Sequence, residues 1–324
     1  MATYYGTYGQ KVQYLASDPS DPQIGQVWYN STSAVLKVRQ DVTTNAWASG
    51  GNLNTARGGI MGVGTQTATV AFGGDNPGPT GATELYNGTS WTNNPTSMNT
   101  ARGSGSGAGT QTAALAFGGS TGTNTGATES FNGSTWTNLP GSMGTARRVL
   151  GGAGTQTAAL AFGGFLTSAD TNVTELWNGT TWSPVANMNT SRDSLTGNGI
   201  QTSALASGGE STVVTGATET WNGSAWTSVS SMNTARYALA GAGSSNTAAL
   251  VFGGFQPSYS TATELWNGST WTTNPNSLAT ARRDFGGSGT QSLGLAFGGN
   301  TGSISSATEE WTGIVATTKT VTVS

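Results

Sequence analysis

The sequence predicts an all-β fold: a six-bladed β-propeller of four-stranded blades, preceded by a short segment with a β-hairpin. Three observations support this prediction. A unit of about 45 residues recurs six times, Asn-Gly turns separate aromatic strands, and no stretch has the apolar period of a helix.

An arginine marks each unit, in the phrase Thr-Ala-Arg or Thr-Ser-Arg, at intervals of 44–46 residues. A Gly-Gly pair and then a glutamate follow, with the glutamate 27 or 28 residues after the arginine. These residues are Arg57, Arg102, Arg147, Arg192, Arg236 and Arg282, with Glu84, Glu129, Glu175, Glu219, Glu264 and Glu309. Because only 8% of the residues are charged, we expect each pair to be buried and to have a structural role.

Four strands are expected in each unit, in a fixed order. A segment of small residues, such as "GSGSGAG" after Arg102, suits the crowded propeller axis, and "TAALAFGG" follows as a continuous apolar strand. The third and fourth strands, "GATESFNG" and "STWTNLPGSM", meet at Asn-Gly, which is a strong hairpin signal. The blades are expected to start near residues 55, 100, 145, 190, 234 and 280.

The last unit has no tryptophan for its fourth strand, and the start of the chain can supply one. Trp47 stands eight residues before Thr55, much as Trp91 stands nine before Thr100. We therefore expect a strand at residues 45–50 to complete the last blade and close the ring, which removes exposed sheet edges. The expected domains are an attachment segment with a β-hairpin at residues 1–44 and a propeller at residues 45–324.

The order of Gly-Gly, Glu-x-aromatic-Asn and Trp resembles the kelch repeat, as at Gly163–Gly164, Trp177–Asn178 and Trp182. The resemblance covers about 270 residues, although Asn stands where kelch repeats usually have Asp. It implies a propeller fold and leaves the activity open, because kelch propellers host unrelated functions.

Residues 1–44 stand outside the repeat. The stretch "SDPSDPQIGQVWYNSTSAVLKVRQ" has a proline-rich lead and then a hairpin pattern, and it resembles an N-terminal segment of tail-fibre and related appendage proteins of tailed bacteriophages. The resemblance implies a structural protein on the surface of a virion, attached to other virion proteins through this segment. Assembly into a homo-oligomer is left open.

The composition limits which ligands, partners and catalytic groups the chain can have. The chain has no histidine and no cysteine, so it lacks the commonest metal ligand and general base, and we expect no metal and no cofactor. No basic stripe is present to bind nucleic acid, and no apolar stretch is long enough for membrane insertion.

Two segments of each unit vary while the rest repeats: the loop after Gly-Gly and the residues directly after the arginine. In a four-stranded blade both emerge at the same end, so they are expected to form one exposed binding face. Around the channel mouth we expect Arg148, Asp193, Tyr237, Arg283 and Asp284, and farther out Phe165, Asp170, Phe255 and Tyr259.

The predicted function is attachment to a host-surface glycan or protein, without enzyme activity. Two alternatives stay open at this point. One is a cellular or secreted kelch scaffold for another protein. The other is a carbohydrate-active enzyme that uses two carboxylates from Asp75, Asp170, Asp193, Glu210, Asp284 and Glu310.

Overall fold

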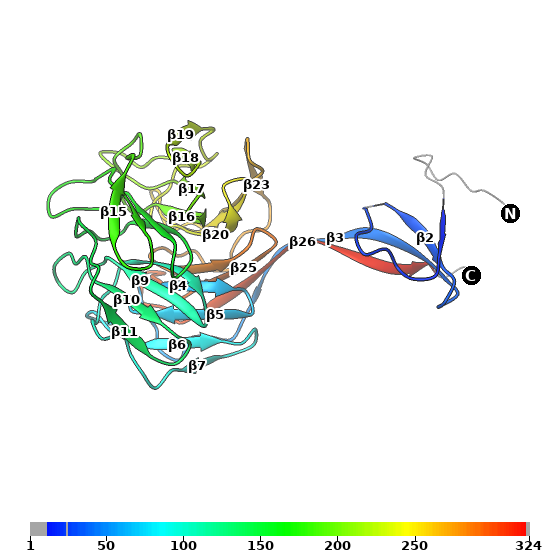
Figure 1. Ribbon diagram of the computed structural model, residues 1–324, viewed down its shortest axis with the longest axis horizontal. Helices are drawn as coiled ribbons and strands as arrows, with labels where there is room; N and C mark the ends of the chain where they lie inside the picture. The colour runs from blue at the N-terminus through cyan, green and yellow to red at the C-terminus, as the bar shows by residue number, and fades with distance from the viewer. Residues whose placement is uncertain (1–11, 24, 322–324) are drawn as a thin grey trace. The chain divides into compact units, whose positions relative to one another are not determined.

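The structure, a computed structural model, describes residues 12–23 and 25–321 (Figure 1). Strands and irregular segments account for all of these residues, and none of them is helical. In this part of the chain there is accordingly no apolar helix of a length that could cross a membrane.

The chain divides into two compact units. The larger unit is Ala46–Trp311, and the smaller one contains the described residues up to Asn45 together with those from Thr312 onward. The sequence analysis placed the residues after Thr312 with the repeats, whereas the structure groups them with the N-terminal segment. Two long strands, β3 (Val35–Ser49) and β26 (Thr308–Val321), contribute residues to both units.

The larger unit contains six repeat sheets, numbered here in chain order. Sheets 1 to 5 each have four antiparallel strands, connected in sequence order. They are sheet 1, β4 (Met61–Thr65), β5 (Ala68–Phe72), β6 (Thr83–Tyr86) and β7 (Trp91–Asn93); sheet 2, β8 (Ser106–Thr110), β9 (Ala113–Phe117), β10 (Thr128–Phe131) and β11 (Trp136–Leu139); sheet 3, β12 (Gly151–Gly154), β13 (Ala159–Phe162), β14 (Thr174–Trp177) and β15 (Trp182–Val185); sheet 4, β16 (Thr196–Ile200), β17 (Ser203–Ser207), β18 (Thr218–Trp221) and β19 (Trp226–Val229); and sheet 5, β20 (Ala240–Ser245), β21 (Ala248–Phe252), β22 (Thr263–Trp266) and β23 (Trp271–Asn274).

Sheet 6 has β24 (Gly286–Gly289), β25 (Leu293–Phe297) and β26 in its first three positions. Its fourth position is taken by β3, from the start of the chain. The first strands of successive sheets contact one another in order, and β24 contacts β4. This cycle of contacts is consistent with a β-propeller (Figure 1).

The second strand of each sheet is the most buried. In β9, for example, residues 114–117 have no exposed surface. Such strands are continuous apolar runs because both of their faces are covered by neighbouring sheets. Glycine occupies alternate positions of the first strands, and in β8 and β12 the residues between the glycines are also small, which suits the limited space.

Tryptophans connect neighbouring sheets in a uniform way. The fourth-strand indole of one sheet donates a hydrogen bond to the threonine that opens the third strand of the preceding sheet, as Trp182 Nε1 does to Thr128 Oγ1 at 3.0 Å. Trp47 Nε1 donates in the same way to Thr263 Oγ1 at 3.0 Å, and its ring lies 4.8 Å from that of Phe252. The expected place of Trp47 in the last sheet is therefore confirmed.

The smaller unit contains the predicted hairpin. Strand β2 (Val27–Asn30) pairs antiparallel with the first part of β3, and β1 (Gln13–Leu15) pairs parallel with β2. Asp18 links the hairpin strands, because it accepts hydrogen bonds from the buried Trp28 indole at 3.0 Å and from Asn30 at 2.7 Å, and it pairs with Lys37 at 2.6 Å. The bond from Lys37, aided by Asn30 and Trp28, lowers the pKa of Asp18 to about 2.

Candidate binding face

Each buried Arg–Glu pair fixes the end of its sheet where the variable segments emerge. All six arginines are fully buried, and their ion pairs with the glutamate of the same unit measure 2.6–3.3 Å. In the first unit the Glu84 carboxylate also accepts the backbone N–H of Asn54 at 2.7 Å, and Arg57 donates to the carbonyl of Gly73 at 2.9 Å. The pair thus ties the segment before the arginine to the Gly-Gly doublet.

Three residues of each unit pair with one another at this end, and together we call them the variable face. The first position directly follows the arginine, the second directly follows Gly-Gly, and the third lies at the end of the same loop. The second residue bridges both of the others. In unit order the triplets are Gly58, Asp75 and Pro79; Gly103, Ser120 and Asn124; Arg148, Phe165 and Asp170; Asp193, Glu210 and Val214; Tyr237, Phe255 and Tyr259; and Arg283, Asn300 and Ile304.

A ring of backbone hydrogen bonds lies at the inner edge of the variable face. The second residue after each arginine is left-handed, with φ of 47–56°, and its N–H donates to the carbonyl of its counterpart in the preceding unit at 2.7–3.0 Å. The ring closes because Gly59 donates to Asp284. Its members are Gly59, Ser104, Val149, Ser194, Ala238 and Asp284.

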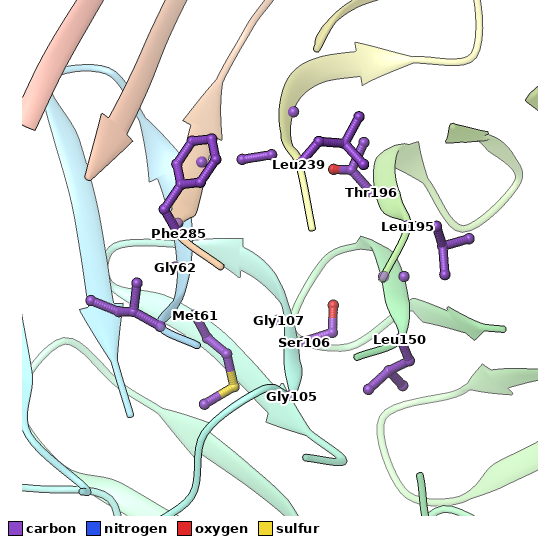
Figure 2. Close-up of a pocket in the computed structure, with 18 residues that line it drawn as sticks. Met61, Gly62, Gly105, Ser106, Gly107, Leu150, Leu195, Thr196, Leu239 and Phe285 are labelled. Atoms are coloured by element: carbon purple, nitrogen blue, oxygen red, sulfur yellow. The ribbon is translucent and has the colours of Figure 1, made fainter. Parts of the chain in front are cut away.

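Three cavities lie along the first strands, and two of them are next to the hydrogen-bonded ring. One, of about 100 Å³, is lined by the six members of the hydrogen-bonded ring, and Asp284 is the only charged residue in its lining. The other, of about 160 Å³, is lined by glycines and by side chains such as Ser106, Thr196 and Phe285, with no charged residue (Figure 2). Asp284, which was expected at a channel mouth, lines the first of these cavities.

A guanidinium occupies the junction between the second and third triplets. Arg148 donates from Nη1 to Asn124 Oδ1 at 3.1 Å and lies over the Phe165 ring, 4.8 Å from its centroid. Asn124 in turn donates to the carbonyl of Phe165 at 2.9 Å. The side chains of neighbouring units therefore hold one another in place.

A second guanidinium occupies the junction between the fifth and sixth triplets. Arg283 lies 4.8 Å from the Phe255 centroid and 5.6 Å from that of Tyr259, and its Nη1 donates to Tyr237 Oη at 3.3 Å. Its Nε lies 3.3 Å from the Asp284 carboxylate. The sequence analysis expected these side chains on an exposed face, and their contacts with one another leave them half-exposed.

Carboxyl groups meet at the junction between the third and fourth triplets. Asp193 and Glu210 are directly opposite in a bridge, with backbone hydrogen bonds of 2.9 and 3.0 Å, and the Asp170 carboxyl interacts with that of Asp193. Burial, together with the charges of Asp170 and Glu210, raises the pKa of Asp193 to about 7. Burial is also the main cause that raises the pKa of Glu210.

The structure brings the nine residues predicted for this face together in two groups: Arg148, Phe165, Asp170 and Asp193; and Tyr237, Phe255, Tyr259, Arg283 and Asp284. The sequence analysis missed Asn124 and Asn300 as partners of these side chains. Both could have been predicted from the sequence, because they lie in the loops after Gly-Gly that differ between units.

No protein-family model matches the chain, and no similar sequence was found among the curated proteins.

Proposed function

We propose that the larger unit is a six-bladed, kelch-like β-propeller whose last blade takes its fourth strand from the start of the chain. The support is the cycle of contacts among the first strands, the closed ring of backbone hydrogen bonds and the repeated tryptophan–threonine bonds. Each of these features passes through all six units and returns to the first.

The propeller serves as a rigid support for a binding face, without catalysis of its own. One observation carries this proposal: the variable residues of all six units pair at one end of the sheets, on a framework of unvarying Arg–Glu pairs. Ligand contacts are commonly built from loops on a rigid scaffold. The half-exposed aromatic rings and guanidinium groups suit a polar ring-shaped ligand such as a surface glycan, or a protein.

The proposed location is the surface of a bacteriophage particle, with the smaller unit attached to other virion proteins. This part of the proposal depends on the resemblance of the N-terminal segment to phage appendage proteins. The compact hairpin fixed by Asp18 supports it, because it forms a unit apart from the repeats. A phage variant carrying Asp18→Ala should contain less of this protein in purified particles, and normal incorporation would contradict the attachment role.

The variable face is tested by combining Arg148→Ala, Tyr237→Ala and Arg283→Ala. The variant should fold with a somewhat lower melting temperature, because cation–aromatic contacts worth about 1 kcal/mol each are lost. It should no longer attach to host cells. The matched control combines Thr112→Ala, Ser134→Ala and Thr180→Ala, which alter exposed residues in turns at the other end of the sheets. Equal attachment by both variants would show that recognition lies elsewhere.

A second candidate function has one specific observation in its favour. Asp170, Asp193 and Glu210 bring carboxyl groups together, and the pKa values of Asp193 and Glu210 are raised, as that of the acid in a glycoside hydrolase is. Release of sugar from host-surface glycan by the native chain, and its loss in Asp193→Asn, would favour the enzyme over the binding protein.

A further inference from the structure

We propose that the carboxyl groups of Asp170, Asp193 and Glu210 form a binding site for the guanidinium group of an arginine side chain on a partner protein. This proposal names the partner of the variable face and so rests on the proposed function. It is carried by the geometry of the junction and by a comparison between repeats of the same chain.

The first observation is the placement of like charges. Asp193 and Glu210 face each other as a cross-strand pair, held by two backbone hydrogen bonds, and such a pair of like charges is destabilising. Asp170 adds a third carboxyl from the preceding unit. An arrangement that costs stability in the free protein becomes favourable when a cation is bound between the groups.

The second observation is that the scaffold already holds a guanidinium at the corresponding place in two other junctions. Arg148 and Arg283 occupy the first position of their triplets, and each contacts the third residue of the preceding triplet, Asn124 or Tyr259. Asp193 has the same first position and Asp170 the same third position. At the positions where the other two junctions have a guanidinium and its partner, this junction therefore has two carboxyl groups.

The third observation is that no internal cation lies within ion-pair distance of these carboxyls, although the charge of Arg283 acts on Glu210 from farther away. The buried glutamate of every unit has its arginine, and Asp284 has Arg283. Across residues 12–23 and 25–321, by contrast, no ion pair is made by Asp170, Asp193 or Glu210. Asp193 is 8% exposed, and its Oδ1 has no hydrogen-bond partner within the same ranges.

A protein side chain fits this site better than an amino sugar. Because Asp193 is almost entirely buried, a ligand has to reach it with a narrow group on a flexible stem, as Arg148 and Arg283 do in their own junctions. The planar guanidinium can also donate to two carboxylates at once. An amino sugar carries its ammonium directly on a ring.

The direct test is titration of the full chain with N-acetyl-arginine amide, followed by NMR. Binding in the millimolar range is expected, and Asp193→Asn or Glu210→Gln should weaken it by about tenfold or more. Asp21→Asn in the smaller unit is the charge-matched control and should leave binding unchanged. Equal binding by the native chain and Asp193→Asn, or no binding at all, would overturn the proposal.

A substitution that supplies the missing cation gives a second test. Asp193→Arg should place a guanidinium in this junction as Arg148 and Arg283 do in theirs, so the melting temperature should rise and N-acetyl-arginine amide should no longer bind. A lower melting temperature with unchanged binding would contradict the inference.

Two further outcomes separate this inference from its alternatives. Tighter binding of a glucosamine oligosaccharide than of N-acetyl-arginine amide would overturn the choice of a protein side chain. The variant with Arg148, Tyr237 and Arg283 replaced can lose attachment to host cells while the native chain does not bind N-acetyl-arginine amide. In that case this inference fails and the proposed function stands. If arginine binds but both that variant and Asp193→Asn still attach to host cells, the site stands and the proposed function fails instead.

Discussion

Single residues show how a chain with few charges distributes them. The six arginines of the repeats are buried, and each has a glutamate partner, whereas the carboxyls of Asp193 and Glu210 lie close to other carboxyls and make no ion pair within the described residues. The first kind of site fixes backbone segments, and the second retains unfavourable electrostatic energy. Each kind leads to a prediction about a particular side chain.

Stability should fall as pH rises through the neutral range because of Asp193. Its pKa is about 7 in the folded protein and about 4 in an unfolded chain, so the folded state binds more protons between these values. The free energy of unfolding should therefore decrease by roughly 1–3 kcal/mol between about pH 4.5 and pH 8. Chemical denaturation across this range measures the effect. Asp193→Asn should remove most of the slope, and an unchanged slope would point to other groups.

Removal of one partner from a buried ion pair should be more damaging than removal of both. Glu175 pairs with Arg147 at 2.6 Å and accepts the backbone N–H of Gly144 at 2.7 Å. Glu175→Leu leaves the Arg147 charge buried and should lower the free energy of unfolding by about 3–5 kcal/mol. The double variant Arg147→Met, Glu175→Leu should lose less in denaturant melts. A larger loss in the double variant would mean that the pair itself stabilises the fold.

Among the strands, β3 has a special place because it crosses from the start of the chain into the last repeat sheet. Its Trp47 packs against Phe252 and Trp311, with ring centroids 4.8 and 5.6 Å away. The other sheets obtain the corresponding tryptophan from their own unit, as sheet 3 does from Trp182. The last sheet thus depends on a segment more than 200 residues distant in sequence, since Trp47 bonds to a residue 216 positions later.

Trp47→Ala should destabilise the larger unit. Trp47 is only partly buried, so we expect a loss of about 2–4 kcal/mol, toward the lower part of the range for core aromatic residues. Thermal unfolding measures the loss, and Ser49→Ala, at an exposed position of the same strand, serves as control. Melting of the Trp47→Ala chain at the native temperature would show that the fourth strand of the last sheet contributes little.

The order of strands and the place of Trp47 could be predicted because both depend on repetition that is visible in the sequence. The Arg–Glu spacing likewise indicated the buried pairs that the structure contains. The left-handed ring could not be predicted, since serine, valine and alanine at Ser104, Val149 and Ala238 give no sign of positive φ. The contacts between neighbouring triplets could not be predicted from the sequence either, because they depend on the relative positions of adjacent sheets.

In the molecule as a whole, one seam differs from the other five. Where sheet 6 meets sheet 1, the Tyr86 hydroxyl donates to the Glu310 carboxylate, and the hydroxyls of Thr69 and Ser288 share a hydrogen bond of 2.6 Å. The positions that correspond to Thr69 in the other units hold only alanine or glycine: Ala114, Ala159, Ala204, Ala249 and Gly294. These polar contacts make the meeting point of the first and last sheets chemically distinct.

Loss of the seam contacts should make the larger unit open more readily at that point. Tyr86→Phe combined with Thr69→Ala removes both seam hydrogen bonds and the bond from Thr69 to the Thr65 carbonyl, and it leaves Glu310 without its tyrosine, so a loss of about 2–4 kcal/mol is expected. Hydrogen exchange should show faster amide exchange in β4 and β24 than in β12. Uniform acceleration over all six sheets, or none, would contradict a seam that opens first.

The hydrogen-bonded ring has a consequence for how such a molecule can change in length over generations. Every unit brings one donor and one acceptor to it, both from the backbone, and the bond is formed in the same way at all six places. A chain with one whole repeat more or fewer would keep the same series of donors and acceptors. In such a chain each N–H in the circle would still find a carbonyl, and Trp47 would still complete the last sheet. The number of repeats, and with it the diameter of the face, can therefore change without any new kind of interaction.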